Sequence, residues 1–352
     1  MRKIVAVVGG GPAGSSAAYW ATASGAQVVQ FERSGPNRDK ACGDALVKEA
    51  VPELREMGIL DASAIRGQVI GESSLEAADG TTWRKEHPGD CWLAPRKLLD
   101  QTLRDRGEHL GVDLRYRTTV LGVEPTADGG FTVQFRGEAG RSSLRADAVV
   151  IAHGVNGKLS QDLGIDGAPI RVPAVSRYQE GIPPAGLHFR FEPEKYGPGY
   201  IWEFPVSADS LNVGIFSLER TDLRIAMDRY TAAVGVPETG TTKWRGAYEP
   251  LWTGQGRRWS AAGGGIISCG DAAGIVDPLT GEGIGPALAT GRVAGRAAAE
   301  YAHGARESAL SYSDWLYDWA EAKYDSHRGR RSLREQLNHT GLVDRQPMVD
   351  AR

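Results

Sequence analysis

The chain has 352 residues, of which 41% are hydrophobic and 24% are charged, and its formal net charge is −3. This size and balance predict an ordinary globular protein of one large or two closely associated domains, and they argue against a nucleic-acid partner. Three cysteines are too few for a disulfide framework, no Cys or His pair has metal-ligand spacing, and no apolar run reaches the ~20 residues of a membrane span. We therefore expect a cytoplasmic protein without a bound metal.

The first elements of the chain have the pattern of a dinucleotide-binding unit. An apolar β-branched run at 4–8 predicts a buried parallel strand, a G-x-G-x-x-G turn and an alanine-rich helix at 15–23 follow, and a second strand at 27–32 ends in an acid. The glycines allow a tight turn and close approach of a pyrophosphate, the helix N-terminus attracts phosphate, and the acid can accept hydrogen bonds from a ribose. The pattern predicts an NAD or FAD site that includes Gly9, Gly11, Pro12, Ala13, Gly14, Glu32 and Arg33.

A second candidate cofactor segment lies near the end of the chain. A predicted strand at 266–269 enters a loop at Gly270 and Asp271, and a helix of small residues is predicted over about 286–301. Asp271 could bind a ribityl or ribose hydroxyl. The turn at 281–284 presents N–H groups near a helix start, which suits the electron-rich N1–C2=O edge of a reduced flavin. Taken alone, the segment could equally be a turn whose glycines serve packing.

Four stretches together resemble the geranylgeranyl reductase family of FAD-dependent oxidoreductases, which has the fold of p-hydroxybenzoate hydroxylase. They are GGGPAGSSAA at 9–18, KACGD at 40–44, GYIWEFP at 199–205 with LNVGI at 211–215, and GDAAGIVDPLTGEGI at 270–284. The resemblance covers roughly residues 1–300. It implies a mixed α/β fold in which a Rossmann-like FAD-binding domain carries an inserted antiparallel β-sheet substrate domain. The implied boundaries are 1–75, 95–160 and 262–302 for the first, 76–94 and 161–261 for the second, and 303–352 for a C-terminal helical tail.

The resemblance also assigns roles to individual residues. Besides the FAD contacts named above, the resemblance implies a further set: Cys42, Gly43, Arg96, Val120, Gly270, Asp271, Gly281, Gly283 and Ile284. Arg96 precedes a helix predicted at 97–106 and could instead be a surface arginine. In this family the cysteine of the Lys-x-Cys-Gly stretch lies close to the flavin, so Cys42 is a candidate to position substrate or deliver a proton. The alternatives are that Cys42 fills a turn as a small buried side chain and that Asp44 is merely solvated.

The source of electrons stays open in the sequence. His153 stands where related hydroxylases carry an aspartate that is tied to pyridine-nucleotide use. NAD(P)H or another external donor could therefore reduce the FAD, and His153 itself is expected to be a hydrogen-bonded structural residue.

The substrate half is predicted from aromatic residues. Tyr200, Trp202 and Phe204 alternate, so on a strand they share one face. The resemblance places these three over an apolar pocket, with Tyr200 and Trp202 beside the reaction, and Trp244, Tyr248 and Trp252 are expected to add to its wall. The alternative is an ordinary aromatic core. An aromatic wall favours a hydrophobic small-molecule substrate.

The leading functional hypothesis is reduction of a C=C bond in an isoprenoid-like compound by hydride from N5 of reduced FAD. The alternative is a monooxygenase or halogenase acting on an aromatic substrate, because the G-x-x-W-x-x-P stretch at 199–205 is also similar to a halogenase pattern, for which Lys85 is a candidate lysine. Aromatic residues at helical spacing from Tyr312 to Trp319 and a cluster of arginines at 328–334 leave peripheral contact with a membrane open. The oligomeric state is not predicted.

Overall fold

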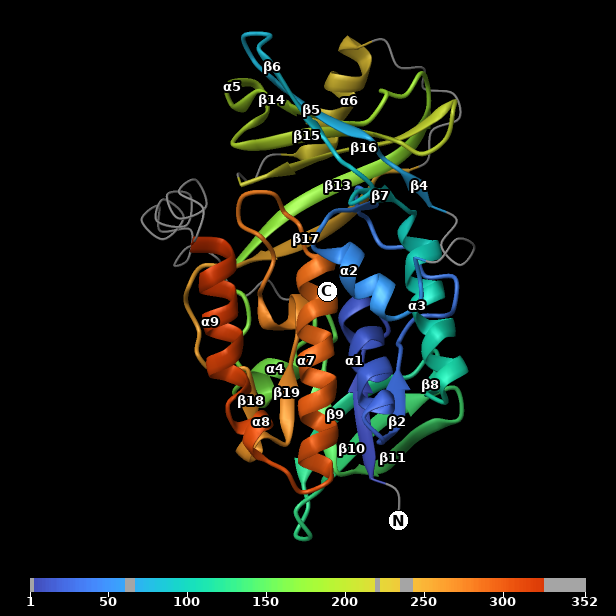
Figure 1. Ribbon diagram of the computed structural model, residues 1–352, viewed down its shortest axis with the longest axis vertical. Helices are drawn as coiled ribbons and strands as arrows, with labels where there is room; N and C mark the ends of the chain where they lie inside the picture. Colours follow the sequence, from blue (N-terminus) through green and yellow to red (C-terminus); the bar gives the residue numbers. More distant parts are fainter. Residues whose placement is uncertain (1–2, 61–66, 219–221, 235–242, 326–352) are drawn as a thin grey trace. The chain divides into compact units, whose positions relative to one another are not determined.

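The computed structural model describes residues 3–60, 67–218, 222–234 and 243–325 (Figure 1). Contacts group the chain into two compact units. Unit 1 is Met1–Arg38, Asp100–Arg171 and Pro250–Arg352, and unit 2 is Asp39–Leu99 and Val172–Glu249. The division expected from sequence differs from this grouping chiefly in two segments: 39–75 clusters with the inserted sheet, and the expected separate tail at 303–352 groups with unit 1. The arginines at 328–334 lie outside the described residues.

Unit 1 is built on a six-stranded sheet with a parallel centre. In sheet order its strands are β18 (Ser260–Ala261), β19 (Ile266–Ser268), β12 (Ala148–Ile151), β1 (Ile4–Val8), β2 (Gln27–Phe31) and β8 (Asp113–Arg115). Strand β1 pairs in parallel with both β12 and β2, so it lies inside the sheet. This position explains its uninterrupted apolar sequence and confirms the buried parallel strand predicted at 4–8.

Two helices of small residues pack side by side in unit 1, α1 (Pro12–Ala23) and α7 (Ile284–Ala302) (Figure 1). A Cβ on Gly291 of α7 would lie 2.4 Å from the carbonyl oxygen of Ala13, so only glycine allows this approach. The Ser16 hydroxyl donates to the Leu288 carbonyl across the same contact at 2.7 Å. Both helices begin a few residues earlier than predicted, because Pro12 is the first residue of α1 and the Gly283 turn leads directly into α7.

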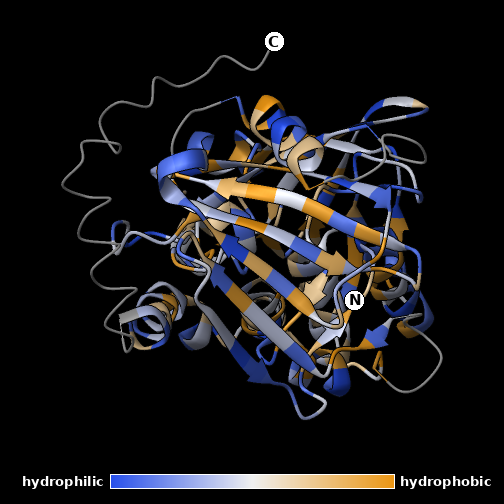
Figure 2. Cartoon of the chain, turned by 90° about the horizontal axis from the view of Figure 1, so that it is seen from above, coloured by the Kyte–Doolittle hydropathy of each residue, from blue (hydrophilic) through white to orange (hydrophobic). Residues whose placement is uncertain are grey.

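An antiparallel sheet of three strands completes the core of unit 1. Its order is β11 (Gly140–Ala146), β10 (Phe131–Gly137) and β9 (Thr119–Pro125). Phe131, Val133 and Phe135 alternate along β10 and are buried in the core cluster that also contains β1 and α1. In Figure 2, hydrophilic and hydrophobic segments alternate along the strands that face the viewer, as expected for sheets that bury one face.

Unit 1 also contains several short helices and the C-terminal helix α9 (Tyr312–Asp325). The short ones are α4 (Leu159–Asp162), η1 (Ala262–Gly264), η2 (Gly270–Ala273) and α8 (Glu307–Leu310). Tyr312 and Leu316 of α9 are buried in the core, and Trp315 and Trp319 are partly buried against it. The aromatic stripe predicted at this helix therefore belongs largely to the core.

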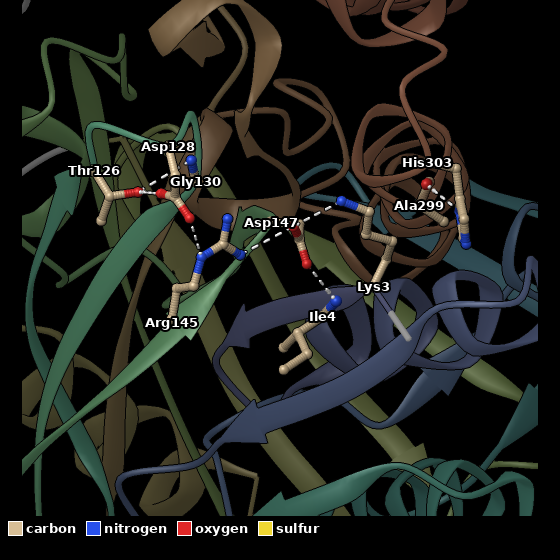
Figure 3. A network of polar contacts seen from close by, with 9 residues as sticks. All are labelled: Lys3, Ile4, Thr126, Asp128, Gly130, Arg145, Asp147, Ala299 and His303. Atoms are coloured by element: carbon tan, nitrogen blue, oxygen red, sulfur yellow. Dashed lines mark hydrogen bonds and ion pairs between the residues drawn. The ribbon is translucent and has the colours of Figure 1, made fainter. Parts of the chain in front are cut away.

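Charged side chains join the start of β1 to the β11–β12 connection (Figure 3). Asp147 accepts hydrogen bonds from the Ile4 N–H at 2.8 Å, Arg145 at 2.9 Å and Lys3 at 3.2 Å. Burial opposes ionisation of Asp147, but the Ile4 N–H and the two cations hold the pKa of its carboxyl below the usual value. Arg145 also donates to Asp128 at 2.8 Å, which extends the network to the turn before β10.

Unit 2 is built on a seven-stranded sheet. In sheet order the strands are β17 (Arg245–Leu251), β13 (Ile170–Glu180), β16 (Ser210–Ser217), β15 (Gly199–Pro205), β14 (Leu187–Phe191), β5 (Glu72–Ala77) and β6 (Thr82–Glu86). Strands β14 and β5 run parallel, whereas β13 with β16, β16 with β15, β15 with β14 and β5 with β6 pair antiparallel, as expected. Helix α6 (Leu223–Ala233) covers one face, where Met227 and Tyr230 pack with Ile201 and Val213. The opposite face carries the aromatic residues described below.

The rest of unit 2 is a small sheet and short helices. The sheet order is β3 (Ala45–Leu46), β7 (Trp92–Leu93) and β4 (Gln68–Val69), and the helices are α2 (Ala50–Glu56) and α5 (Pro193–Tyr196). Helix α3 (Arg96–Leu110) starts at Arg96 and is five residues longer than the predicted helix at 97–106. None of the helices in the described part of the chain is long and apolar enough to cross a membrane.

Candidate functional site

The G-x-G-x-x-G turn of unit 1 has the shape of a phosphate cradle. Gly9 has φ +118°, and a Cβ there would lie 2.2 Å from the Ala152 carbonyl oxygen. A Cβ on Gly14 would lie 2.0 Å from the Gly9 oxygen, so neither glycine can be replaced without a shift of the backbone. At Gly11, the N-cap of α1, an added Cβ would meet no atom within 4 Å. Open space before the N–H groups of a 12-residue helix fits a dinucleotide pyrophosphate.

Glu32 lies directly after β2 and is almost fully buried. Its Oε2 accepts the Gly10 N–H at 2.8 Å and its Oε1 accepts the Ser34 N–H at 2.7 Å. These bonds aim the carboxylate at the glycine turn, where it could accept hydrogen bonds from a ribose. The neighbouring Arg33 is exposed.

Arg104 of α3 also supports the glycine turn, and sequence reasoning missed it. Its guanidinium is buried and donates to the Gly10 carbonyl at 3.1 Å and the Pro36 carbonyl at 2.9 Å. The partners are far away in sequence, and Arg104 looks like any arginine of an amphipathic helix. Nothing local in the sequence marks its role.

The two predicted parts of the C-terminal cofactor segment meet in unit 1. Gly270 and Asp271 begin η2, and the Gly270 N–H donates to the Thr290 hydroxyl of α7 at 3.1 Å. A Cβ on Gly283 would lie 3.7 Å from Oδ1 of Asp271, which shows how closely the 281–284 turn approaches the carboxylate. Gly281 has φ +66°, and Ile284 is the first residue of α7. The donors and the acid expected to hold a flavin and its ribityl chain are therefore neighbours.

Val120 is placed elsewhere in unit 1. It lies on β9 opposite Phe135 and is partly buried against the core. Its assignment to the cofactor remains a prediction.

A small pocket adjoins Asp271, and His153 lines it together with Ser160 and Arg171. The His153 Nδ1 bonds the Gly154 carbonyl at 2.7 Å, while Nε2 faces the Ser160 hydroxyl at 2.9 Å and its N–H at 3.3 Å. Burial lowers the pKa of His153, so the ring is neutral with its proton on Nδ1. Both ring nitrogens are thus committed to the local loop, in agreement with the structural role expected for His153.

In unit 2, the segment expected to contact the flavin is held by a buried carboxylate. Asp44 has φ +66° and is 1% exposed, which rules out the alternative that its side chain is solvated. Its Oδ2 accepts the Tyr178 hydroxyl at 2.6 Å and the Asn212 amide at 2.7 Å, and its Oδ1 accepts the Arg96 N–H at 3.0 Å. Burial raises the pKa of Asp44, and these three donors oppose that rise. Burial and the nearby Asp44 raise the pKa of Tyr178 as well.

The same segment lies against the predicted aromatic strand. A Cβ on Gly43 would lie 2.7 Å from the Phe204 ring and 3.3 Å from Nε1 of Trp202. Asn212 ties both sides together, because its amide donates to the Cys42 carbonyl at 2.7 Å and its oxygen accepts Trp202 Nε1 at 3.0 Å. The structure thus brings Cys42 and Gly43 together with Trp202 and Phe204.

Five aromatic rings form one cluster on the sheet face opposite α6. The ring of Tyr200 is 6.1 Å from that of Trp202 and 5.6 Å from that of Phe216, and the ring of Phe189 is 5.5 Å from Tyr200 and 5.1 Å from Phe204. Sequence analysis identified three members and missed Phe189 and Phe216, because strand register is not readable from the sequence.

Two of the other expected wall residues lie elsewhere. Trp244 packs with the α6 cluster and under the Arg177 guanidinium, and Trp252 is buried in the core of unit 1. Tyr248 is 45% exposed on β17. The prediction that they line one wall with Tyr200 was therefore wrong for Trp244 and Trp252.

The Cys42 thiol is in a neutral state. Burial raises its pKa, and the nearby Arg96 charge only partly opposes this effect. A protonated thiol can donate a proton but is a poor nucleophile. Within the described residues, no cluster of His, Cys, Asp and Glu could hold a metal ion. Lys85 is exposed on the edge strand β6, three strands away from β15.

Comparison with known proteins adds independent information. Residues 2–174 match the family model of an FAD binding domain. A menaquinone reductase from Mycolicibacterium smegmatis is 31% identical over 318 residues, covering 83% of this chain and 75% of that protein. Digeranylgeranylglycerophospholipid reductase 1 from Methanopyrus kandleri is 27% identical over 366 residues, covering 98% of this chain and 93% of that protein. The crystal structure of a geranylgeranyl bacteriochlorophyll reductase-like protein from Thermoplasma acidophilum has a TM-score of 0.76 at 20% identity, covering 100% of this chain and 94% of that one, which confirms the fold.

Proposed function

Because the chain belongs to the geranylgeranyl reductase family of FAD-dependent oxidoreductases, we propose that it reduces a carbon–carbon double bond in a prenyl chain. The observation that carries this proposal is the aromatic cluster of β14, β15 and β16 against the Cys42–Gly43 segment. Such a surface binds apolar chains and excludes water. The relatives named above are reductases of a menaquinone and of a geranylgeranyl lipid, which supports the same substrate class.

The residues of unit 1 fit FAD as the cofactor. The Gly9–Gly14 turn would hold the pyrophosphate, Glu32 the adenosine ribose, Asp271 the ribityl chain and the 281–284 turn the flavin edge. Bound and reduced, FAD supplies a hydride from its N5. NAD(P)H is a candidate external donor, and comparing flavin reduction by NADPH, NADH and dithionite tests this assignment.

The chain's own residues would orient the alkene and supply the proton. The rings of Tyr200, Trp202 and Phe204 bind the prenyl chain and fix the reacting carbons. One carbon receives the hydride, and the neutral Cys42 thiol gives its proton to the other, so the C=C bond becomes a CH–CH bond. The thiolate then regains a proton from water. Asp44 and Asn212 act as positioning residues, because Asn212 binds the Cys42 carbonyl and the Asp44 carboxylate anchors the chain two residues further on.

The proposal is tested by an anaerobic half-reaction. Enzyme-bound FAD is reduced with dithionite, excess reductant is removed, and geranylgeraniol or a menaquinone is added. We expect the oxidised flavin spectrum to return and, after any quinol has been reoxidised to the quinone in air, the product to contain one more H₂ per reduced double bond of the prenyl chain. If neither compound reoxidises the flavin while air produces a C4a-hydroperoxide absorbance, the oxygenase or halogenase alternative replaces the proposal.

A further inference from the structure

We propose that the β5–β6 hairpin of unit 2 binds the distal part of the substrate's prenyl chain, so that the chain lies across four strands from Trp202 to Trp83. This inference rests on the proposed function, because it takes the aromatic cluster as the place of the reacting double bond. Beyond the proposed function, it assigns a path to the part of the prenyl chain that does not react, and it explains why the β5–β6 edge of the sheet carries apolar side chains.

Strand register places four apolar side chains in one row. Trp202 of β15 is opposite Phe189 of β14, Phe189 is opposite Leu75 of β5, and Leu75 is opposite Trp83 of β6. Residues that are opposite one another across a sheet point to the same face. With neighbouring strands about 4.8 Å apart, the row spans roughly 14 Å. It is therefore long enough for an extended chain of more than one prenyl unit.

Exposure rises along this row. Trp202 is 5% exposed, Phe189 is partly buried, Leu75 is 40% exposed and Trp83 is 56% exposed. Phe191, two residues along β14 from Phe189, adds another ring that is 42% exposed. A gradient from buried to open, made of apolar side chains throughout, is what a path into a buried site requires. Apolar groups gathered at an exposed edge otherwise cost solvation and invite aggregation.

The two faces of the hairpin differ in polarity, as binding of a prenyl chain on one of them requires. On the α6 side, Glu76 pairs with Arg190 at 3.0 Å and with His188 at 3.5 Å, and Glu72 lies 3.6 Å from Arg84. On the aromatic side, β5 presents Leu75 between Ser73 and Ala77. The ion pairs thus lie on one face, whereas the other face carries the apolar row and a single lysine, Lys85, opposite Ser73.

The occupant follows from continuity with the ring cluster. The row begins at the rings that would bind the reacting alkene, and its members from Trp202 to Trp83 contribute dispersion and apolar contact. A ligand held by apolar contact alone gains affinity with each added methylene group. The affinity of the enzyme should therefore increase with prenyl chain length until the chain reaches Trp83.

The experiment compares geranylgeraniol with the shorter geraniol in the anaerobic half-reaction. In the native protein, we expect half-saturation by geranylgeraniol at a concentration at least tenfold lower than by geraniol. Trp83→Ser should raise the half-saturating concentration of geranylgeraniol roughly tenfold, because about one exposed indole contact is lost. The half-saturating concentration of geraniol should stay unchanged. Trp83→Phe should restore most of the difference. The matched control is Ile225→Ser on α6, which removes a side chain that is 50% exposed on the opposite side of the sheet and should change neither value.

A second measurement locates the chain directly and does not depend on turnover. A geranylgeranyl probe with a diazirine at its distal end should label peptides from 72–86 in the native protein and lose this labelling in Trp83→Ser. The inference is wrong if Trp83→Ser changes the half-saturating concentrations of geraniol and geranylgeraniol by the same factor. It is also wrong if the probe labels other segments. In both cases the proposed function stands. A Trp83→Ser effect on vesicle binding or oligomeric state with unchanged chain-length preference would also overturn it. Failure of both alcohols to reoxidise the flavin in every variant would overturn the proposed function itself.

Discussion

Replacing Tyr178 with phenylalanine removes one oxygen atom from the buried Asp44 network and keeps the ring. The Tyr178 hydroxyl donates to Oδ2 of Asp44 at 2.6 Å, in a site where the carboxylate is 1% exposed. Two donors then remain for Asp44, the Asn212 amide and the Arg96 N–H. The variant therefore leaves a buried charge with one hydrogen bond fewer.

A hydrogen bond to a charged group contributes about 1.5–3 kcal/mol, so we expect Tyr178→Phe to lower the free energy of unfolding by about 2 kcal/mol at pH 8. The loss should depend on pH. Burial raises the folded-state pKa of Asp44 above 3.8, so the ionised form reduces stability as pH rises from the unfolded-state pKa through the folded one. Without the Tyr178 donor the folded-state pKa rises further, so the decline continues to higher pH and the total loss of stability is larger. Below both pKa values the carboxyl is neutral, and the cost of the substitution should fall to about 1 kcal/mol.

Urea unfolding followed by tryptophan fluorescence at pH 3 and pH 8 measures both quantities, and deuterium exchange of the 40–46 backbone reports the local effect. Tyr248→Phe is the matched control, because Tyr248 lies on the same sheet and is 45% exposed. We also expect a lower kcat with little change in KM, since Asp44 positions the backbone of Cys42. Equal urea midpoints for the two variants, or a Tyr178→Phe effect that is the same at both pH values, would refute a charged hydrogen bond at this site.

Three further substitutions test other parts of the structure. Gly14→Ala places a Cβ 2.0 Å from the Gly9 oxygen and should yield protein without yellow colour, whereas Ala23→Gly at the far end of α1 should keep the flavin. Cys42→Ala should slow reoxidation by the alkene about 100-fold and leave reduction of the flavin unchanged; equal slowing of both steps would exclude a proton-donor role. Asp147→Asn should lower stability by about 0.5 kcal/mol at pH 7. Because the folded-state pKa of Asp147 is depressed, this difference should disappear as pH falls through that pKa, and a constant difference would contradict the ion-pair account.

The cofactor half of the fold could be predicted because its signals are local. The strand at 4–8, the glycine turn, the helix after it and Glu32 occupy one continuous stretch, and each residue type has a specific physical requirement. Gly270–Asp271 and the 281–284 turn are likewise near neighbours in sequence. The structure confirms these elements and shows the two parts of the second segment in contact.

The substrate half could be predicted only in part. Alternation placed Tyr200, Trp202 and Phe204 on one face, but Phe189 and Phe216 come from neighbouring strands whose register depends on tertiary pairing. Tyr178 and Asn212 were missed for the same reason, since their partner Asp44 is more than a hundred residues away. Trp252 was misplaced because an aromatic residue near a predicted wall is equally compatible with burial in another core.

The contact between α1 and α7 has a consequence for which cofactor can be used. The phosphate turn and the 281–284 turn stand at the N-termini of these two helices, and Gly291 rests directly on the Ala13 carbonyl. The helices touch there through backbone and small side chains such as that of Ser16, so no long side chain sets the distance between the two turns. Backbone contact therefore fixes the distance between the two turns. A single side-chain exchange along the helix pair cannot adapt the site to a shorter flavin nucleotide.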